Sequence, residues 1–198
     1  MNYDLFQSGD SATPPSEEER LALIPSITTR AELNQVERIN INEARVWAMR
    51  ASVLQRTDLL TDAFVRELHR RMFNGVWRWA GRYTTTKKNI GWEVHRLTEG
   101  VHNALADAQA WLEHSTYPLH EVAVRLHHQL VVIHPWPNGN GRHARLLADI
   151  IVAARGGKAL TWGAVDLAAA GVVRQRYIVA MQQADQGNFV PLLVFAPS

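Results

Sequence analysis

The most informative part of this sequence is His134-Pro135-Trp136-Pro137-Asn138-Gly139-Asn140-Gly141-Arg142-His143-Ala144-Arg145. An apolar run, 130–133, leads into it, and apolar residues at helical spacing follow it at positions 146, 147, 150 and 151. The loop therefore ends at the start of a predicted helix, where unbonded N–H groups and the helix dipole favour an anion. Glycine allows the backbone to approach a phosphate closely.

The charged residues of this stretch point to phosphate chemistry. Arg142 and Arg145 are one helical turn apart, and an arginine can bind phosphate oxygens with two parallel hydrogen bonds. His134 precedes the loop, and a neutral imidazole there can accept a proton from an attacking hydroxyl group. Together these residues predict transfer of a phosphorus-containing group. The alternative is a glycine-rich turn between two helices, with solvated arginines and a packed histidine.

The stretch resembles the signature of the Fic family, His-x-Phe-x-Asp/Glu-Gly-Asn-Gly-Arg-x-x-Arg. Trp136 replaces the usual Phe, and Asn138 replaces the usual acid. With residues 28–41 and 77–91, the chain is similar to the Fic branch called mobile mystery protein B. This resemblance implies a mainly α fold, a Fic-type helical bundle with one β-hairpin flap.

The resemblance also implies an activity, transfer of AMP from ATP to a hydroxyl side chain of a target protein (AMPylation) with Mg²⁺ or Mn²⁺. His134 takes the position of the general base, and Asn138 that of the metal ligand. The second arginine of the motif meets the γ-phosphate or an inhibitory glutamate. By position, the nucleotide-binding residues are Asn138, Gly139, Asn140, Gly141, Arg142 and Arg145.

Asn138 is the departure from the family pattern that matters most. Mg²⁺ prefers hard, usually charged oxygen ligands, and an asparagine carbonyl brings no negative charge. Three interpretations stay open: a slower AMP transferase, a transferase of another group such as UMP, phosphocholine or phosphate, and a nucleotide-binding regulatory protein. The last would be a toxin–antitoxin-like partner with weakened catalysis.

The N-terminal part is predicted to contain a regulatory helix. Thr29 and Glu32 form a capping box that opens a helix of roughly 25 residues. Many Fic proteins carry an inhibitory helix with the pattern Ser/Thr-x-x-x-Glu-Gly/Asn, and 33–38 is the nearest match here, so Glu37 is the inhibitory candidate and Glu32 a second one. The alternative is an ordinary solvated helix face. We expect residues 1–55 to form this N-terminal segment and 56–198 the Fic core domain.

The segment 83–94 has little helical periodicity. Its β-branched residues around Asn and Gly predict a hairpin. In Fic proteins a flap at this place docks the target by pairing with its backbone. The candidate docking residues are Thr86, Lys87, Lys88 and Asn89.

Capping and periodicity predict the remaining helices. They cover 16–23, a stretch from Thr61, 97–115, 118–133, 164–170 and 172–184, and 189–195 is apolar enough to dock on the core.

The composition indicates a globular protein with 46% hydrophobic and 20% charged residues. A net charge of only +2 and scattered basic residues argue against a nucleic-acid partner. There is no cysteine, which excludes a thiolate nucleophile and a disulfide and is compatible with the cytoplasm. No signal peptide or membrane span is visible, so we expect a cytoplasmic protein whose partners are a target protein and a regulatory, antitoxin-like protein.

Overall fold

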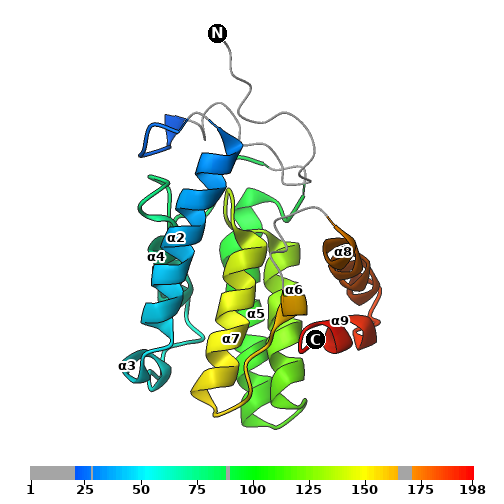
Figure 1. Ribbon diagram of the computed structural model, residues 1–198. Coiled ribbons are helices and arrows are strands. Elements are labelled where there is room, and N and C mark those ends of the chain that lie inside the picture. Colours follow the sequence, from blue (N-terminus) through cyan, green and yellow to red (C-terminus); the bar gives the residue numbers. More distant parts are fainter. Residues whose placement is uncertain (1–20, 28, 88–89, 165–170) are drawn as a thin grey trace.

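The computed structural model describes residues 21–27, 29–87, 90–164 and 171–198, which form helices and connecting loops (Figure 1). The α-helices are α2 (Arg30–Ala48), α3 (Ala51–Leu54), α4 (Asp62–Phe73), α5 (Leu97–Glu113), α6 (Leu119–Ile133), α7 (Asn140–Ala154), α8 (Val172–Asp185) and α9 (Val190–Phe195). Two short 3-10 helices are η1 (Val94–Arg96) and η2 (Trp162–Ala164). These ranges contain no β-strand, only an isolated bridge between Leu23 and Trp77. The mainly α prediction is confirmed.

Side-chain caps start the first two long helices where the sequence predicts. Thr29 Oγ1 accepts a hydrogen bond from Glu32 N at 3.1 Å, and a Glu32 carboxylate oxygen accepts one from Thr29 N at 3.1 Å. Thr61 caps α4 by accepting from Phe64 N at 3.2 Å. Helix α2 ends at Ala48, after 19 residues, so it is shorter than predicted.

The other predicted helices have mixed outcomes. Helices α5, α6 and α8 confirm the predictions for 97–115, 118–133 and 172–184. The 189–195 segment is itself helical, as α9, and docks through Leu192 and Phe195, which are buried. The short helices predicted at 16–23 and 164–170 lie almost entirely outside the described residues. Within the described part of the chain, none of the helices has the length and apolar character needed to cross a membrane.

Two clusters of buried side chains lie on either side of α6 and α7. The larger cluster fills the space among α2, α4, α5, α6 and α7, with Phe64, Leu126 and Leu147 fully buried. The smaller one joins α6 and α7 to α8 and α9, which lie to the right in Figure 1. Helices α6 and α7 are therefore buried on two sides, which fixes the end of the bundle where the loop 134–139 connects them.

Helix α7 is also tied to its surroundings through Asp149, a buried acid. Its carboxylate accepts hydrogen bonds from Arg45 of α2 at 2.8 Å and from the Trp162 indole N–H at 3.0 Å. Burial nevertheless raises the pKa of Asp149 to about 6, because it disfavours the charged form more than these two donors favour it.

The predicted β-hairpin is wrong for the described residues of its segment, 83–87 and 90–94, which form no strand. Two of their backbone N–H groups bond instead to the last residue of α6 and to the loop that follows it. Thr84 N donates to Pro135 O at 2.8 Å, and Trp92 N donates to Ile133 O at 3.1 Å. Donors used in this way are not available for pairing within a hairpin, which explains the difference.

Candidate functional site

The conformation of the loop between α6 and α7 is held by hydrogen bonds between the Asn140 side chain and the loop backbone. Asn140 accepts a hydrogen bond from Trp136 N at 2.9 Å and donates one to Trp136 O at 2.8 Å. Both residues are buried, with Trp136 only 1% exposed. The Asn140 side chain therefore shapes the loop, and only its backbone N–H remains for a ligand.

Two buried histidines pack against the loop. The Trp136 ring stacks on His69 at 4.1 Å, and its indole N–H donates to His143 Nδ1 at 3.3 Å. His69 accepts from Gly81 N through Nδ1, so its Nε2–H donates to Asn138 O at 3.2 Å. Burial lowers the pKa of His69 well below its ordinary value and that of His143 to about 4. Both rings are thus neutral at pH 7, with each proton assigned by its partners.

His134 lies at the C-terminal end of α6 in a left-handed conformation, with φ 57°. A non-glycine residue there is under backbone strain, which is common at functional sites. Its Nδ1 lies 3.3 Å from Val131 O, and a carbonyl can only accept, so Nδ1 carries the proton in the neutral ring. The lone pair is then on Nε2, the nitrogen that can act as a base.

The described residues 84–87 and 90–92 lie next to His134, because two of their backbone N–H groups bond to the residues before and after this histidine. A Cβ atom on Gly91, whose φ is +100°, would lie 2.6 Å from His134 Cβ. Only glycine permits this approach. Thr86 and Lys87 are exposed on this segment, and Lys87 pairs with Glu93 at 2.5 Å. Lys88 and Asn89 lie outside the described residues.

The start of α7 presents backbone amides. Gly139 is its N-cap, with φ 81°, and the Phe73 ring fills the space where a Cβ would be, 2.3 Å away. The first bond of the helix is donated by His143 N to Gly139 O at 2.8 Å. The N–H groups of residues 140–142 precede that bond, and no side chain of the described residues caps the helix. This is the arrangement that binds anions at helix N-termini.

A carboxylate from α2 occupies the neighbouring space. Glu37 is 2% exposed, and one of its oxygens accepts from Arg142 at 2.6 Å. The other accepts from the Trp77 indole N–H at 2.7 Å and from the Asn138 amide at 2.9 Å. We call Glu37, Trp77, Asn138 and Arg142 the Glu37 cluster.

The expected pairing of an inhibitory glutamate with Arg145 is wrong for this structure, since Glu37 binds Arg142. Arg145 has no carboxylate of the described residues within salt-bridge distance, and it lies under Tyr177, 5.6 Å from the ring centre. Burial lowers the pKa of Arg145 below its ordinary value. The second candidate, Glu32, is exposed and serves the α2 capping box.

The divalent cation that the family resemblance implies does not fit the side chains as they lie here. The Asn138 carbonyl oxygen already accepts from Gly139 N at 2.7 Å and lies 3.4 Å from an Arg142 nitrogen. A guanidinium group beside the ligand oxygen repels a cation. No group of three acidic, histidine or cysteine side chains in the described ranges could hold a metal ion.

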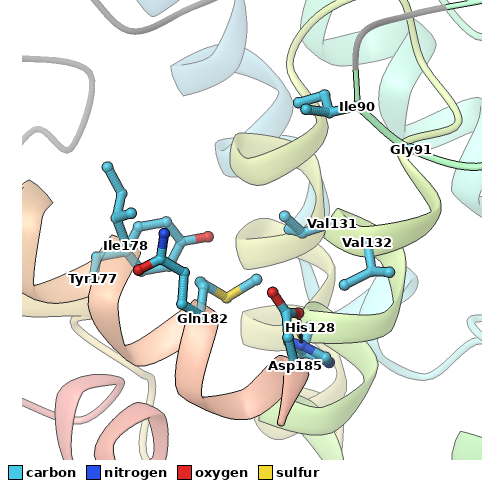
Figure 2. A pocket seen from close by; sticks show the side chains of 10 residues that line it. Ile90, Gly91, His128, Val131, Val132, Tyr177, Ile178, Gln182 and Asp185 are labelled. Carbon is cyan, nitrogen blue, oxygen red and sulfur yellow. Dashed lines mark hydrogen bonds and ion pairs between the residues drawn. The ribbon is translucent and has the colours of Figure 1, made fainter.

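A cavity of about 530 Å³ lies between α6 and α8, beside the loop (Figure 2). Tyr177, Ile178 and Gln182 of α8 face Val131 and Val132 of α6 across it. Ile90 and Gly91 close one end, and the His128–Asp185 pair, 2.8 Å apart, lies at the other. This volume and apolar lining suit a small organic ligand.

Sequence reasoning missed three contributors to the site. His69 and Trp77 lie far along the chain from the loop. Tyr177 connects the cavity to the start of α7, since its hydroxyl lies 3.9 Å from where a Gly141 Cβ would be. The spacing of residues in α8 predicts a helix, but it does not predict which part of the protein Tyr177 contacts. No local pattern could have identified these contacts.

The protein is an α-helical bundle in which the loop between α6 and α7 brings a histidine close to the free N–H groups and the two arginines at the start of α7. Residues 59–152 match the Fic/DOC family, so the chain contains a Fic/DOC family domain. This confirms the family resemblance of the loop sequence.

Curated relatives support the same assignment. The chain is 26% identical over 175 residues to "Protein adenylyltransferase Fic" of Nematostella vectensis, covering 86% of this chain and 39% of the relative. It is 38% identical over 93 residues to "Protein adenylyltransferase fic-1" of Caenorhabditis elegans, covering 44% of this chain and 18% of the relative. The chain thus spans well under half the length of the curated relatives it matches.

Solved structures share the fold. Fic-1 (residues 134–508) of C. elegans superposes with a TM-score of 0.63 at 24% identity, covering 91% of this chain and 52% of that one. BepC, a VirB-translocated effector protein from Bartonella tribocorum with bound AMPPNP, superposes with a TM-score of 0.67 at 15% identity, covering 100% of this chain and 96% of that one.

Proposed function

We propose that this protein transfers AMP from ATP to a hydroxyl side chain of a target protein. The observation that carries the proposal is the meeting of the α7 amides, Arg142, Arg145 and His134 at one end of the bundle. Relatives named protein adenylyltransferases support this reaction over other phosphate chemistry. That the chain belongs to the mobile mystery protein B branch stays a prediction.

The nucleotide would occupy two neighbouring parts of the site. The adenine and ribose would enter the cavity between α6 and α8, and the phosphates would lie on the amides of residues 140–142. Arg145 supports this arrangement, because a cation with no carboxylate partner in the described residues is suited to an anionic ligand. Its neighbour Tyr177 lines the cavity and so connects the two parts.

In the proposed reaction the target hydroxyl oxygen attacks the α-phosphorus and forms a new P–O bond. The bond from the α-phosphorus to the oxygen bridging it to the β-phosphorus breaks, and pyrophosphate leaves. The hydroxyl proton passes to Nε2 of His134, whose orientation is held by the Nδ1 contact to Val131 O. Thr84 and Trp92 bond to the backbone on either side of this histidine, and the residues between them that we propose as the docking site for the target are Thr86, Lys87, Lys88 and Asn89.

The test is His134→Ala, assayed with labelled ATP and by calorimetry. Loss of a positioned base costs ~10²–10⁴-fold in rate, whereas nucleotide affinity should stay within about twofold because the phosphates bind elsewhere. Undiminished labelling by the variant would contradict the role of His134. Labelled UTP and CDP-choline assayed in parallel would test the other transfer reactions.

We further propose that Glu37 keeps the site inactive and that residues 1–55 act on the core formed by 56–198. Support comes from the Glu37 cluster, which ties Arg142 and Asn138 to α2. Glu37→Gly should raise transfer, and Glu43→Gly is the matched control, since Glu43 is exposed on the same helix and gives the same loss of helix propensity. Equal turnover and ATP affinity in both variants would contradict the inhibitory role.

A second candidate function is nucleotide-dependent regulation with weakened catalysis. The observation in its favour is that Asn138 donates to Glu37 and its carbonyl oxygen accepts from Gly139 N. Binding of ATP without transfer, even in Glu37→Gly supplied with Mg²⁺ or Mn²⁺, would support it. A cytoplasmic location and a regulatory, antitoxin-like partner belong to these proposals.

A further inference from the structure

Asn138 departs from the family pattern at the residue that contacts the α2 carboxylate. Its amide nitrogen donates to Glu37 at 2.9 Å, and its carbonyl oxygen accepts from Gly139 N at 2.7 Å. The partners fix the orientation of the amide, because a backbone N–H can only donate and the acceptor on the other side is a carboxylate. The side chain thus joins Glu37, through its amide nitrogen, to the start of α7, through its carbonyl oxygen.

The acid that the family pattern places at this position would change that contact. It would put a carboxylate oxygen where the amide nitrogen now lies, at hydrogen-bond distance from a second carboxylate that is 2% exposed. Two carboxylates so close cannot both stay ionised: they must share a proton or move apart. An amide removes this conflict and adds a donor.

We propose that Asn138 is the hydrogen-bond partner that allows the Glu37 carboxylate to lie against the loop, and that position 138 decides whether this site holds that carboxylate or a divalent cation. The inference deepens the proposed function and rests on it for its biological meaning. An amide at this position makes the closed arrangement stable, and the same arrangement withdraws the carbonyl oxygen from metal binding.

The position of Arg142 indicates that the site can hold either the Glu37 carboxylate or a cation, but not both. Arg142 pairs with Glu37 on one side and lies 3.4 Å from the Asn138 carbonyl on the other. While Glu37 is seated, this guanidinium is held beside the oxygen that a metal ion would need. Departure of the Glu37 carboxylate would release both Arg142 and the amide, so capture of the cation and withdrawal of Glu37 are a single event.

The first test is a charge-swap cycle followed by thermal melting in chelator-treated buffer. Asn138→Asp should melt below the parent protein. Adding Glu37→Gln to it should restore part of the loss, because the new amide can donate to the new carboxylate. The recovery is incomplete because the amide nitrogen then replaces the oxygen that accepts from the Trp77 indole N–H. We expect a coupling of about tenfold in the unfolding equilibrium between the two positions. Asn42→Asp on the exposed face of α2 controls for the added charge.

The pH dependence of stability distinguishes the carboxylate pair from a simple packing defect, which would cost the same stability at every pH. In Asn138→Asp the folded state holds a shared proton that the unfolded chain releases near pH 4, so the variant should lose stability relative to the parent as the pH rises from 5 to 8. The other charged or titratable groups facing the site are Arg142 and Arg145 of α7 and His69 of α4. They are common to both proteins and cancel in the difference.

The second test is calorimetric titration with Mn²⁺ alone. Asn138→Asp should bind Mn²⁺ at least about tenfold more tightly than the parent and than Asn42→Asp. Additive melting shifts, a pH-independent difference between variant and parent, or equal Mn²⁺ affinity would each overturn the inference. None of these measurements uses ATP or a target, so a failure to transfer AMP would leave the inference standing, and an absent coupling would leave the transfer reaction standing.

Discussion

The substitution Gly139→Ala tests the geometry of the loop most directly. Gly139 has φ 81°, and a methyl group on it would lie 2.3 Å and 2.6 Å from two atoms of the Phe73 ring. Phe73 itself is fully buried and has no room to move aside. The new side chain therefore meets an unfavourable backbone conformation and a steric clash at once.

The expected cost follows from these two effects. A left-handed conformation costs a non-glycine residue ~1–2 kcal/mol. Forcing an extra carbon into a packed core costs a further ~1–3 kcal/mol. The sum of about 2–5 kcal/mol is a large share of the ~5–15 kcal/mol that stabilises a typical domain, and it should lower the melting temperature by on the order of 10 °C.

Thermal and urea denaturation followed by circular dichroism would measure this loss. Gly141→Ala is the matched control, because position 141 does not have a positive φ and its nearest neighbour is a flexible Arg145 nitrogen at 3.4 Å. It should leave stability within about 1 kcal/mol, since alanine is favoured in a helix, while weakening nucleotide binding through the methyl group placed among the amides. Equal stability of the two variants would refute the packing argument.

Three further predictions use other parts of the structure. Ile178→Trp should fill the cavity and weaken ATP binding by at least about tenfold, whereas Val179→Trp on the exposed side of α8 should not. Equal ATP affinities of the two variants by calorimetry would show that the adenine binds elsewhere. His143→Gln should flatten the acid dependence of stability, because a folded-state pKa of about 4 against 6.5 unfolded costs the parent ~3 kcal/mol as the pH falls from 6.5 to 4; unchanged urea midpoints across that range would contradict this. Asp149→Asn should gain stability relative to the parent by up to ~3 kcal/mol as the pH rises from 4 to 7, since the folded-state pKa of Asp149 is about 6 and the buried parent carboxyl must ionise in that range; a pH-independent difference would be the opposing result.

Local sequence signals predicted most of the helices. Side-chain caps at Thr29 and Thr61 mark helix starts, and apolar periodicity outlines α5, α6 and α7, because both signals arise within a few residues of chain. The hairpin prediction failed for the described part of 83–94, since donors such as those of Thr84 and Trp92 bond to carbonyls some 40 to 50 positions away in the chain.

The candidate site was predictable only in part. The loop sequence identifies His134 and the arginines, and Glu37 was placed on the correct helix. Its partner was misjudged because the contact joins positions separated by 105 residues and depends on how α2 packs, which no short pattern encodes. The roles assigned to these residues stay predictions.

Helix α2 lies outside the region that matches the Fic/DOC family, and it precedes the loop in the chain. Because synthesis proceeds from the N-terminus, the ribosome completes α2 before it makes the loop at the start of α7. The Glu37 carboxylate is therefore already synthesised when the loop folds. It can bond to Asn138 and Arg142 as soon as the nascent chain contains them.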